Sequence, residues 1–543
     1  MSFGTFSYPL PANEPVLAYA PGSPERKRLK EVLTELKRQE IDVPMYIGSK
    51  EVRTGKKVGM HPPHQRKHVL GYFHQGEEKH VHQAIEAALE VRAAWAAMSW
   101  ENRAAIFLKA ADLIATKYRP YMTGTTMLGQ SKNAFQAEID AACELIDFLR
   151  FNVHYLSEIY KQQPASAPGI HNRMEYRPLE GFVLAVSPFN FTAIGGNLPT
   201  APALCGNVVV WKCANTQVYS AQMTMRILKE AGLPDGVINL IYVDGATLGR
   251  VCFNHREFAG VHFTGSTGVF NTMWETIGKN MARYRSYPRI VGETGGKDFV
   301  LAHRSADPDV LVTALLRGAF EYQGQKCSAA SRAYIPSNIA DEVKKKLVAG
   351  LKSFKMGSVE NFSNFINAVI DQKSFDSIKR YIDQAKKDPK CIILSGGKCD
   401  DKEGFFVQPT LIETKNPKSL TMCEEIFGPV LTIYVYPAGN FEKAMELVDT
   451  TSPYALTGAI IAQDRSAVER ATERLRHAAG NFYINDKPTG AVVGQQPFGG
   501  GRASGTNDKA GAMLNLYRWL SARTIKETFV PPTDYRYPFM AEE

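Results

Sequence analysis

Four short apolar segments in the middle of the chain constrain its fold more than any other feature. They are rich in β-branched residues and span 181–187, 207–212, 237–243 and 260–264. Segments that can be helical separate them, and one of these, Ser220–Ala231, ends at Gly232-Leu-Pro234, a helix-stop signal. Apolar strands that alternate with helices are typical of a parallel sheet covered on both faces. The sequence therefore predicts an α/β fold.

Further elements are expected on both sides of this region. Apolar residues at helical spacing predict upstream helices over 79–98, 102–117 and 134–150. A second α/β region is expected to begin near Glu293. It would contain a helix over 308–323, strands over 391–394, 430–436 and 481–485, and a turn at Thr457-Gly458. The apolar tail, Leu516–Phe529, is expected to pack on another surface, such as a neighbouring subunit.

The composition excludes several classes of protein. A chain of 543 residues is long enough for roughly two to four domains. Its hydrophobic content of 44% and charged content of 22% are ordinary for a soluble globular protein. The net charge is only +9 and Lys and Arg are scattered, so the sequence offers no basic stripe for nucleic acid. No run of about 18 apolar residues occurs, so no membrane span is expected.

The eight cysteines show no C-x-x-C pair and no zinc-ligand spacing. They are expected to be reduced thiols in a reducing compartment. The first residues, Met1–Pro9, contain no basic segment followed by an apolar one and are not Arg-rich. We therefore expect a cytoplasmic protein, with the mitochondrial matrix as the alternative if the chain is a processed eukaryotic form.

Six of the twelve histidines fall between His61 and His82. The pattern His61-x-x-His64-x-x-x-His68 could ligate zinc, but two prolines interrupt its first turn and no acidic residue or Cys completes the set. The better interpretation is a solvated hairpin followed by the start of a helix. We expect no metal site.

Two later segments carry residues suited to covalent catalysis. Cys327 lies in a loop of small residues just past the helix predicted over 308–323, and Glu293 lies in a glycine turn after Ile290-Val291. A thiol can add to an electrophilic carbon, and a nearby carboxylate can activate the water that later releases the product. Taken alone, Cys327 also fits a packed thiol and Glu293 a capping carboxylate.

A candidate dinucleotide site lies at Phe263–Val269. This segment follows a predicted strand and precedes a predicted helix, where backbone N–H groups can hold a pyrophosphate. No G-x-G-x-x-G fingerprint follows the first strand, and the run Gly499-Gly-Gly501 follows no strand. By itself the motif also fits an ordinary strand-to-helix turn.

Four motifs occur in a characteristic order: Ser187-Pro-Phe-Asn190, Gly292-Glu-Thr-Gly-Gly-Lys297, Gly324-Gln-Lys-Cys-Ser328 and Glu425-Ile-Phe-Gly-Pro429. With them the chain resembles the aldehyde dehydrogenase superfamily. The resemblance implies the aldehyde dehydrogenase fold. Its parts would be a Rossmann-like cofactor domain (1–156 and 181–292), an α/β catalytic domain (293–500), and a β-strand oligomerisation arm with a tail (157–180 and 501–543).

The resemblance also implies oxidation of an aldehyde with NAD through a thioester. Cys327 would attack the aldehyde carbon, and Glu293 would activate the hydrolytic water. The side-chain amide of Asn190 and the backbone N–H of Cys327 would stabilise the oxyanion. The cofactor-binding residues would be Ser187, Lys212, Gly265, Ser266, Thr267, Gly268, Val269, Glu425 and Phe427.

One position bears on the choice of cofactor. Lys212 resembles the family lysine that binds the adenosine ribose, and many NAD-selective members carry an acidic residue three positions later. Here that position is Asn215, and an amide rejects a 2′-phosphate less strongly than a carboxylate does. We expect NAD, with use of NADP left open.

The resemblance runs from Asn13 to Glu527 and points to L-glutamate γ-semialdehyde as the substrate, oxidised to L-glutamate in the second step of proline catabolism. The supporting segments are 136–142, 144–147, 187–196, 324–328 and 494–499. Such a pocket needs donors for a carboxylate and an acceptor for an ammonium. By resemblance the carboxylate anchor is Ser328, Gly490 and Ala491, the acidic group near the amine is Glu144, and the clamps on the aliphatic chain are Phe191 and Phe498. The two phenylalanines also fit plain core packing.

Two other functions stay open from the sequence. One is a dehydrogenase of another ω-semialdehyde or of betaine aldehyde. The other is a Cys-dependent hydrolase or acyltransferase without NAD, although no histidine partner for Cys327 is evident. The expected partners are a small-molecule substrate, further copies of the chain in a homodimer or larger homo-oligomer, and a functional pairing with proline dehydrogenase.

Overall fold

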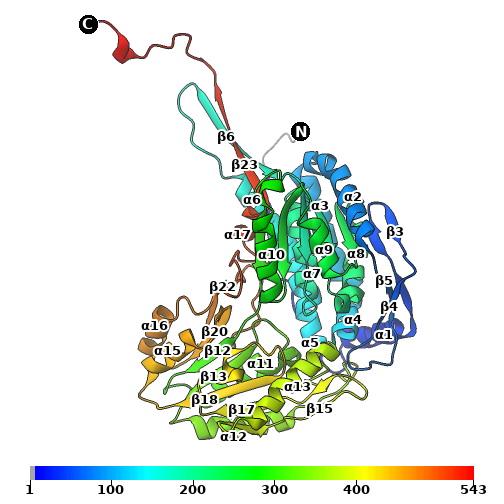
Figure 1. The fold of residues 1–543 in the computed structure, drawn as a ribbon, viewed down its shortest axis with the longest axis vertical. Coiled ribbons are helices and arrows are strands. Elements are labelled where there is room, and N and C mark those ends of the chain that lie inside the picture. The colour runs from blue at the N-terminus through cyan, green and yellow to red at the C-terminus, as the bar shows by residue number, and fades with distance from the viewer. Residues whose placement is uncertain (1–5) are drawn as a thin grey trace.

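The computed structural model describes residues 6–543, so the predictions made for Met1–Thr5 lie outside the described residues. Two seven-stranded sheets form two lobes, and a two-stranded ribbon projects from the first lobe (Figure 1). The predicted α/β class is confirmed.

The first lobe is built on a sheet with the strand order β11-β10-β7-β8-β9-β2-β3. The first five strands in this order are parallel, and β2 and β3 continue the sheet in antiparallel fashion. Their bounds are β2 Met45–Ile47, β3 Lys50–Val52, β7 Phe182–Val186, β8 Val208–Lys212, β9 Ile238–Ile241, β10 Phe258–Thr264 and β11 Arg289–Glu293. The connecting helices are α7 Thr192–Leu204, η3 Asn215–Gln217, α8 Val218–Ala231, α9 Gly245–Cys252, α10 Thr267–Lys279 and η4 Met281–Arg283. All four predicted strands are present and buried, as a sheet covered on both faces requires.

The order of the parallel strands reverses between β7 and β10. From β7 the chain continues to β8 and β9 on one side, whereas β10 and β11 lie on the other. Such a reversal leaves a crevice at the carboxyl ends of the two strands, because their connections leave in opposite directions. Val186, the last residue of β7, pairs with Phe263 of β10. The loops that begin at Ser187 and Gly265 therefore start side by side.

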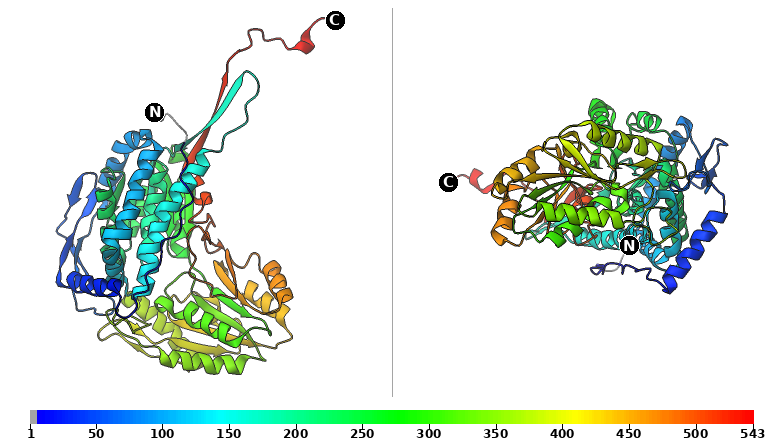
Figure 2. Two further views of the ribbon diagram at one scale, coloured as in Figure 1. Left: turned by 180° about the vertical axis from the view of Figure 1, so that it is seen from behind. Right: turned by 90° about the horizontal axis from the view of Figure 1, so that it is seen from below.

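Helices from the first 160 residues pack around this sheet (Figure 2). They are α1 Pro24–Arg38, α2 Glu78–Ala97, α3 Trp100–Leu113, η1 Ile114–Tyr118, α4 Arg119–Gln130, α5 Ala134–Ala137, η2 Glu138–Glu144 and α6 Leu145–Tyr160. The three predicted upstream helices are present, but two of them include a π-helical turn, η1 and η2. A π-helical turn changes which side chains face inward, and η2 buries both Glu138 and Asp140.

The second lobe is built on a sheet with the order β14-β17-β18-β13-β12-β20-β21, in which only β14 is antiparallel to its neighbour. The strands are β12 Asp298–Ala302, β13 Ala330–Pro336, β14 Cys391–Ser395, β17 Thr410–Thr414, β18 Val430–Tyr436, β20 Thr457–Ile461 and β21 Asn481–Ile484. The helices are α11 Pro308–Phe320, η5 Glu321–Gly324, α12 Ala340–Ser353, α13 Gln372–Lys387, α14 Leu420–Cys423, α15 Phe441–Thr450 and α16 Arg465–Arg474. Two short pairs, β15 Cys399–Asp400 with β16 Phe406–Val407 and β19 Tyr454–Ala455 with β22 Gly501–Arg502, complete this part.

The turn predicted at Thr457-Gly458 is wrong, because these residues begin β20. Gly458 pairs with Phe299 of β12, and a Cβ on it would lie 2.2 Å from the Phe299 ring. The glycine therefore permits close packing inside a strand rather than a change of direction.

The prediction of a solvated histidine-rich hairpin is wrong for three of its side chains. This region forms a small sheet of β1 Ile41–Val43, β5 Gly71–His74 and β4 Lys57–Met60. His64, His74 and His80 are buried. His64 bonds Ser131 Oγ at 3.0 Å, His74 bonds Asp42, and the His80 ring accepts from the Glu77 N–H. These bonds explain their burial, and no three His, Cys, Asp or Glu residues within 6–543 are grouped as metal ligands.

The projecting ribbon consists of β6 Ile170–Pro178 and β23 Leu520–Thr528, paired antiparallel along their full length (Figures 1 and 2). In the chain, β23 follows α17 Met513–Tyr517, and a short helical turn, η6 Pro538–Met540, comes after β23. Leu516 and Trp519 are buried in the core of the first lobe, so this part of the tail packs on its own chain.

The division into domains drawn from the sequence stays a prediction. All eight cysteines are free thiols, and none of the helices described over 6–543 is long and apolar enough to cross a membrane.

The start of β7 depends on a glycine. Gly181 has a φ of +131°, and a Cβ there would lie 2.1 Å from the Glu257 carbonyl oxygen. Gly181→Ala should therefore destabilise the fold by more than about 1 kcal/mol, because both the φ and the contact oppose a side chain. Chemical denaturation would measure this. Gly245→Ala is the matched control, since Gly245 is the first residue of α9 with open space around it, and it should be neutral or stabilising. Equal stability of the two variants would contradict the prediction.

Candidate active site

The candidate site lies where the two sheets meet end to end. From the first sheet come the carboxyl ends of β7, β8, β10 and β11, which carry Ser187, Lys212, Gly265 and Glu293. From the second come the segments that precede β13 and β18, which carry Cys327 and Glu425. Hydrogen bonds join the two edges: Asn190 Nδ2 donates to the Gln325 carbonyl at 2.9 Å, and the Gly296 N–H donates to Glu425 Oε1 at 2.9 Å.

The Cys327 loop is held in an unusual backbone conformation. Three consecutive residues of η5, Tyr322, Gln323 and Gly324, have φ values of 50°, 54° and 65°. A Cβ on Gly324 would lie 2.2 Å from the Gly428 carbonyl oxygen, so only glycine fits. The Gln323 side chain fixes the turn, since its amide donates to Ala368 O at 2.8 Å and Ser131 O at 3.0 Å. Strain of this kind persists only where surrounding bonds determine it.

The Cys327 side chain is buried, with 8% of its surface exposed. Burial raises the pKa of its thiol well above the usual range, and the carboxylates Glu293, Asp298 and Glu425 add to that shift. The thiol is therefore protonated in the free protein, and a proton acceptor is needed before it can act as a nucleophile.

Glu293 is the last residue of β11 rather than part of a glycine turn. Burial raises its pKa to about 8, Lys509 opposes this shift and Asp508 adds to it. The segment that carries Asp508 and Lys509 also holds the backbone beside Glu293. Thr506 Oγ1 accepts from the Gly292 N–H at 3.0 Å and donates to Asp508 at 2.5 Å.

The cofactor side has the geometry that a dinucleotide requires. Gly265 and Ser266 form the turn between β10 and α10, and Thr267, Gly268 and Val269 begin the helix. No side chain caps this amino terminus, a Cβ on Gly268 would meet nothing within 4 Å, and 48% of the Val269 surface is exposed. Free N–H groups at an open helix terminus fit a pyrophosphate.

The other predicted cofactor residues differ in their burial and in the hydrogen bonds that they already make. The Ser187 hydroxyl already donates to Gln217 and accepts from Trp211 Nε1, both at 3.0 Å, and its backbone N–H donates to the Lys212 carbonyl at 3.1 Å. Lys212 is half-buried at the end of β8, and burial lowers its pKa. Burial raises the pKa of Glu425 to about 7. Phe427 has a φ of 56°, and its ring lies edge-on to Phe189 with centroids 5.7 Å apart.

The six predicted substrate residues come from four separate parts of the chain. Ser328 is buried and its hydroxyl lies 2.7 Å from Thr489 Oγ1, next to Gly490 and Ala491. Gly490 has a φ of +93° and is exposed. Glu144 ends η2, and burial raises its pKa well above the usual range. Phe191 precedes α7, and Phe498 pairs through its backbone with Ala510 at 3.0 and 2.8 Å. Both rings are half-buried.

A profile of the aldehyde dehydrogenase family matches residues 51–525. The chain belongs to the aldehyde dehydrogenase family. It is 55% identical to the mitochondrial delta-1-pyrroline-5-carboxylate dehydrogenase of Dictyostelium discoideum over 545 residues, covering 99% of this chain and 97% of the relative. The solved structure of delta-pyrroline-5-carboxylate dehydrogenase from Mycobacterium tuberculosis bound with NAD is similar with a TM-score of 0.96 and 52% identity, covering 100% of both chains. Proline utilization A (PutA) from Bdellovibrio bacteriovorus is similar with a TM-score of 0.91 and 30% identity over 96% of this chain and 53% of that one.

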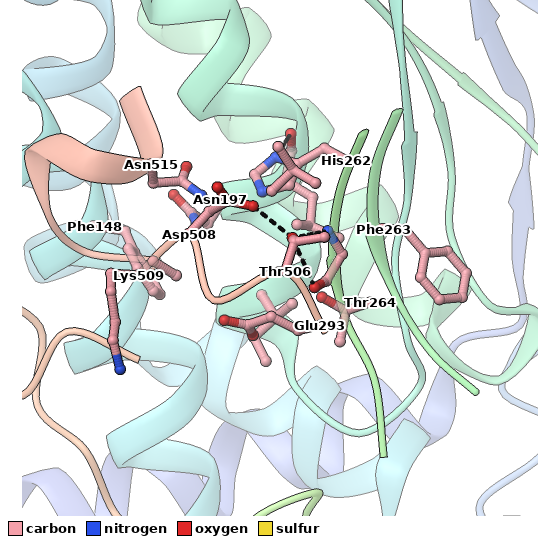
Figure 3. A pocket seen from close by; sticks show the side chains of 15 residues that line it. Phe148, Asn197, His262, Phe263, Thr264, Glu293, Thr506, Asp508, Lys509 and Asn515 are labelled. Carbon is pink, nitrogen blue, oxygen red and sulfur yellow. Dashed lines mark hydrogen bonds between the residues drawn. The ribbon is translucent and has the colours of Figure 1, made fainter. Parts of the chain in front are cut away.

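Several residues beside the candidate site were not predicted from the sequence. Thr506, Asp508 and Lys509 line a cavity beside Glu293, and Figure 3 shows the hydrogen bond between Thr506 and Asp508 near Glu293. Lys132 and Asp140 form a fully buried ion pair near Phe191. Neither set belongs to a local motif, because each reaches the site through packing between distant segments. The one sequence feature that could have indicated Lys132, Asp140, Asp508 and Lys509 is that these charged residues stand among apolar or turn-forming residues.

The raised pKa of Glu293 makes stability depend on pH. A carboxyl whose pKa is 4.5 in the unfolded chain and about 8 in the folded state contributes its full stability below about pH 4.5, and this contribution is lost progressively as the pH rises to about 8. Glu293→Gln stays neutral, so its thermal midpoint should exceed that of the parent protein by much more at about pH 9 than at about pH 5. Glu90→Gln, at an exposed position of α2, is the control and should change both midpoints equally. A Glu293→Gln effect that does not depend on pH would refute this.

Proposed function

We propose that this aldehyde dehydrogenase oxidises L-glutamate γ-semialdehyde, the open-chain form of 1-pyrroline-5-carboxylate, to L-glutamate with NAD, as the second step of proline catabolism. Relatives that match nearly the whole chain carry the name of this activity. The single observation that carries the proposal is the junction of the two sheets, where the Asn190 amide bonds the backbone of the Cys327 loop beside an open strand-turn-helix segment.

The first chemical step would be attack by Cys327 on the aldehyde carbon. The thiol must lose its proton, and Glu293 and Glu425, with pKa values raised to about 8 and about 7, are acceptors suited to neutral pH. The carbonyl oxygen then carries the negative charge, and the Asn190 amide and the Cys327 N–H would stabilise it. Asn190 is suited to this because its bond to Gln325 O fixes the plane of the amide.

NAD, when bound, would supply the acceptor for the hydride that leaves this carbon. Cys327 then holds the acyl group as a thioester, and Glu293 would remove a proton from the water that attacks it. The products are the carboxylate and the free thiol. Gly265–Val269 would hold the pyrophosphate, and Lys212 and Glu425 would hold the two riboses.

Substrate binding would use both ends of the amino acid. Ser328, Gly490 and Ala491 would bind the α-carboxylate, and Glu144 would face the ammonium. Phe191 and Phe498 would lie against the aliphatic chain. Membership of the family favours this reading over a hydrolase that works without NAD.

We further propose how the enzyme assembles, which enzyme it works with and in which compartment it acts. The β6–β23 ribbon and the exposed tail would join copies of the chain into a dimer or larger oligomer, since apolar side chains such as Phe529 and Tyr537 lie exposed there. A functional pairing with a proline dehydrogenase is supported by the similarity to PutA. We also propose a reducing compartment, the cytoplasm or the mitochondrial matrix, because all eight cysteines are free.

Reduction of NAD, followed by absorbance, tests the main proposal with glutamate semialdehyde, succinic semialdehyde and acetaldehyde. The enzyme should strongly prefer glutamate semialdehyde, because only this aldehyde engages both the carboxylate anchor and Glu144. Cys327→Ala should abolish turnover, since no other thiol lies in the loop. Similar rates with all three aldehydes would overturn the substrate assignment, and no reduction of NAD with any of them would overturn the dehydrogenase assignment.

Cofactor selectivity is tested at Asn215, an exposed residue three positions after Lys212. Asn215→Asp should lower kcat/KM for NADP by about tenfold or more through repulsion of the 2′-phosphate, and leave kcat/KM for NAD within about twofold. Asn361→Asp makes the same charge change at an exposed site in the second lobe and should alter neither value. An equal loss with both cofactors would show that Asn215 has another role.

A further inference from the structure

Lys132 is a fully buried lysine that the proposed reaction does not use. It lies in the short connection between α4 and α5, and its side chain has no exposed surface. Its ammonium donates to Asp140 Oδ2 at 2.7 Å, and the Asp140 side chain is also fully buried. Removing two charges from water is costly, so a pair of this kind points to a task that apolar side chains could not perform.

The remaining N–H groups of the Lys132 ammonium face two aromatic rings. The nitrogen lies 4.1 Å from the centre of the Phe191 ring and 4.5 Å from the centre of the Tyr322 ring. Both distances are well within the range of a cation–π interaction, which is strongest when the cation is desolvated. One carboxylate and two ring faces thus account for all three donors of the ammonium.

The two rings belong to opposite sides of the junction between the lobes. Phe191 directly follows Asn190 on the first lobe, and Tyr322 lies in η5 of the second lobe, five residues before Cys327. The Tyr322 hydroxyl is buried and has no hydrogen-bond partner among the described residues, so the contact with Lys132 is the polar interaction that holds this ring. Lys132 therefore touches both of the segments that would form the oxyanion site and the nucleophile.

Asp140 extends the same connection to the helix behind Asn190. Its carboxylate accepts from the N–H groups of Thr192 at 3.0 Å and Ala193 at 2.9 Å, the first two residues of α7. A carboxylate in this position stabilises a helix amino terminus. Loss of the Lys132 charge would leave Asp140 as an unpaired buried anion, and α7 would have to move or Asp140 would have to take up a proton.

We propose that Lys132 is a positioning residue that holds the Asn190 amide and the Cys327 loop in alignment across the junction of the two lobes. It acts through Phe191, Tyr322 and Asp140 and does not touch the substrate. Its effect on turnover rests on the proposed function, whereas its effect on the Cys327 loop does not.

Lys132→Met keeps most of the length of the side chain and removes the ammonium group with its charge. We expect kcat for glutamate semialdehyde to fall by about 100-fold, the loss that goes with a displacement of about 1 Å at a reacting centre. The Kd for NAD should stay within about twofold, because the Gly265–Val269 turn is untouched. Tyr322→Leu should lower kcat in the same way. The kcat of the double variant should be no lower than that of the less active single variant, because both substitutions remove the same interaction.

Glu138→Gln is the matched control. Glu138 is a fully buried residue of η2 that pairs with Arg119 and with the Tyr19 hydroxyl, so its loss lowers stability without reaching the junction. It should lower the thermal midpoint at least as much as Lys132→Met and leave kcat within about twofold. If both variants lower kcat equally, or if Lys132→Met leaves it unchanged, the positioning role is refuted.

Alkylation of Cys327 by iodoacetamide, followed by mass spectrometry, gives a readout that needs no aldehyde turnover. Lys132→Met should raise the alkylation rate about threefold or more, because the loop opens more often, and Glu138→Gln should not change it. An unchanged rate in Lys132→Met would overturn the proposal even if the protein oxidised no aldehyde, and a raised rate in an inactive protein would overturn only the proposed function.

Discussion

The removal of water from one small region between the two sheets is the constraint on which the rest of the site depends. The carboxyl ends of one parallel sheet face the amino ends of strands in the other, so charged side chains from both are enclosed together. Burial is the largest cause of the raised pKa values of Cys327, Glu293 and Glu425. The raised pKa values make the ionised forms of Glu293 and Glu425 stronger proton acceptors, and the protonated Cys327 thiol needs such an acceptor before covalent attack.

Burial in the same region imposes a high desolvation cost on the ion pairs there, and these pairs are concentrated around the Cys327 loop. Glu321 accepts from Lys326 at 3.1 Å and from Lys487 at 2.8 Å, and Lys132 pairs with Asp140 at 2.7 Å. Buried pairs of this kind contribute little net stability, but their geometry is specific. They surround a turn with three left-handed residues, which needs fixed partners to persist. The charges near the site therefore account for its rigidity better than for the stability of the fold.

Much of the fold could be read from local patterns. The four strands between Gly181 and Thr264 were predicted because each is short, apolar and β-branched, and the helix ending at Gly232 because its stop signal is local. The turn at Thr457-Gly458 failed because a glycine in a strand and a glycine in a turn have the same local signature, and only the ring of Phe299 tells them apart. The prediction of a solvated histidine-rich hairpin was wrong for a related reason. The burial of His64 depends on Ser131, which is 67 positions away in the sequence.

The sequence by itself determined the elements, the family and the residue types that can carry the chemistry, because strand patterns and motifs are properties of neighbouring residues. Only the tertiary structure decided which distant groups meet: Lys132 with Phe191 and Tyr322, Asp140 with the start of α7, and Thr506 with Gly292. Such contacts follow from the packing of whole elements and from the closing of long loops, and no local pattern encodes them. The pKa values of the site belong to the same class, since burial sets them and burial exists only once the two lobes have met.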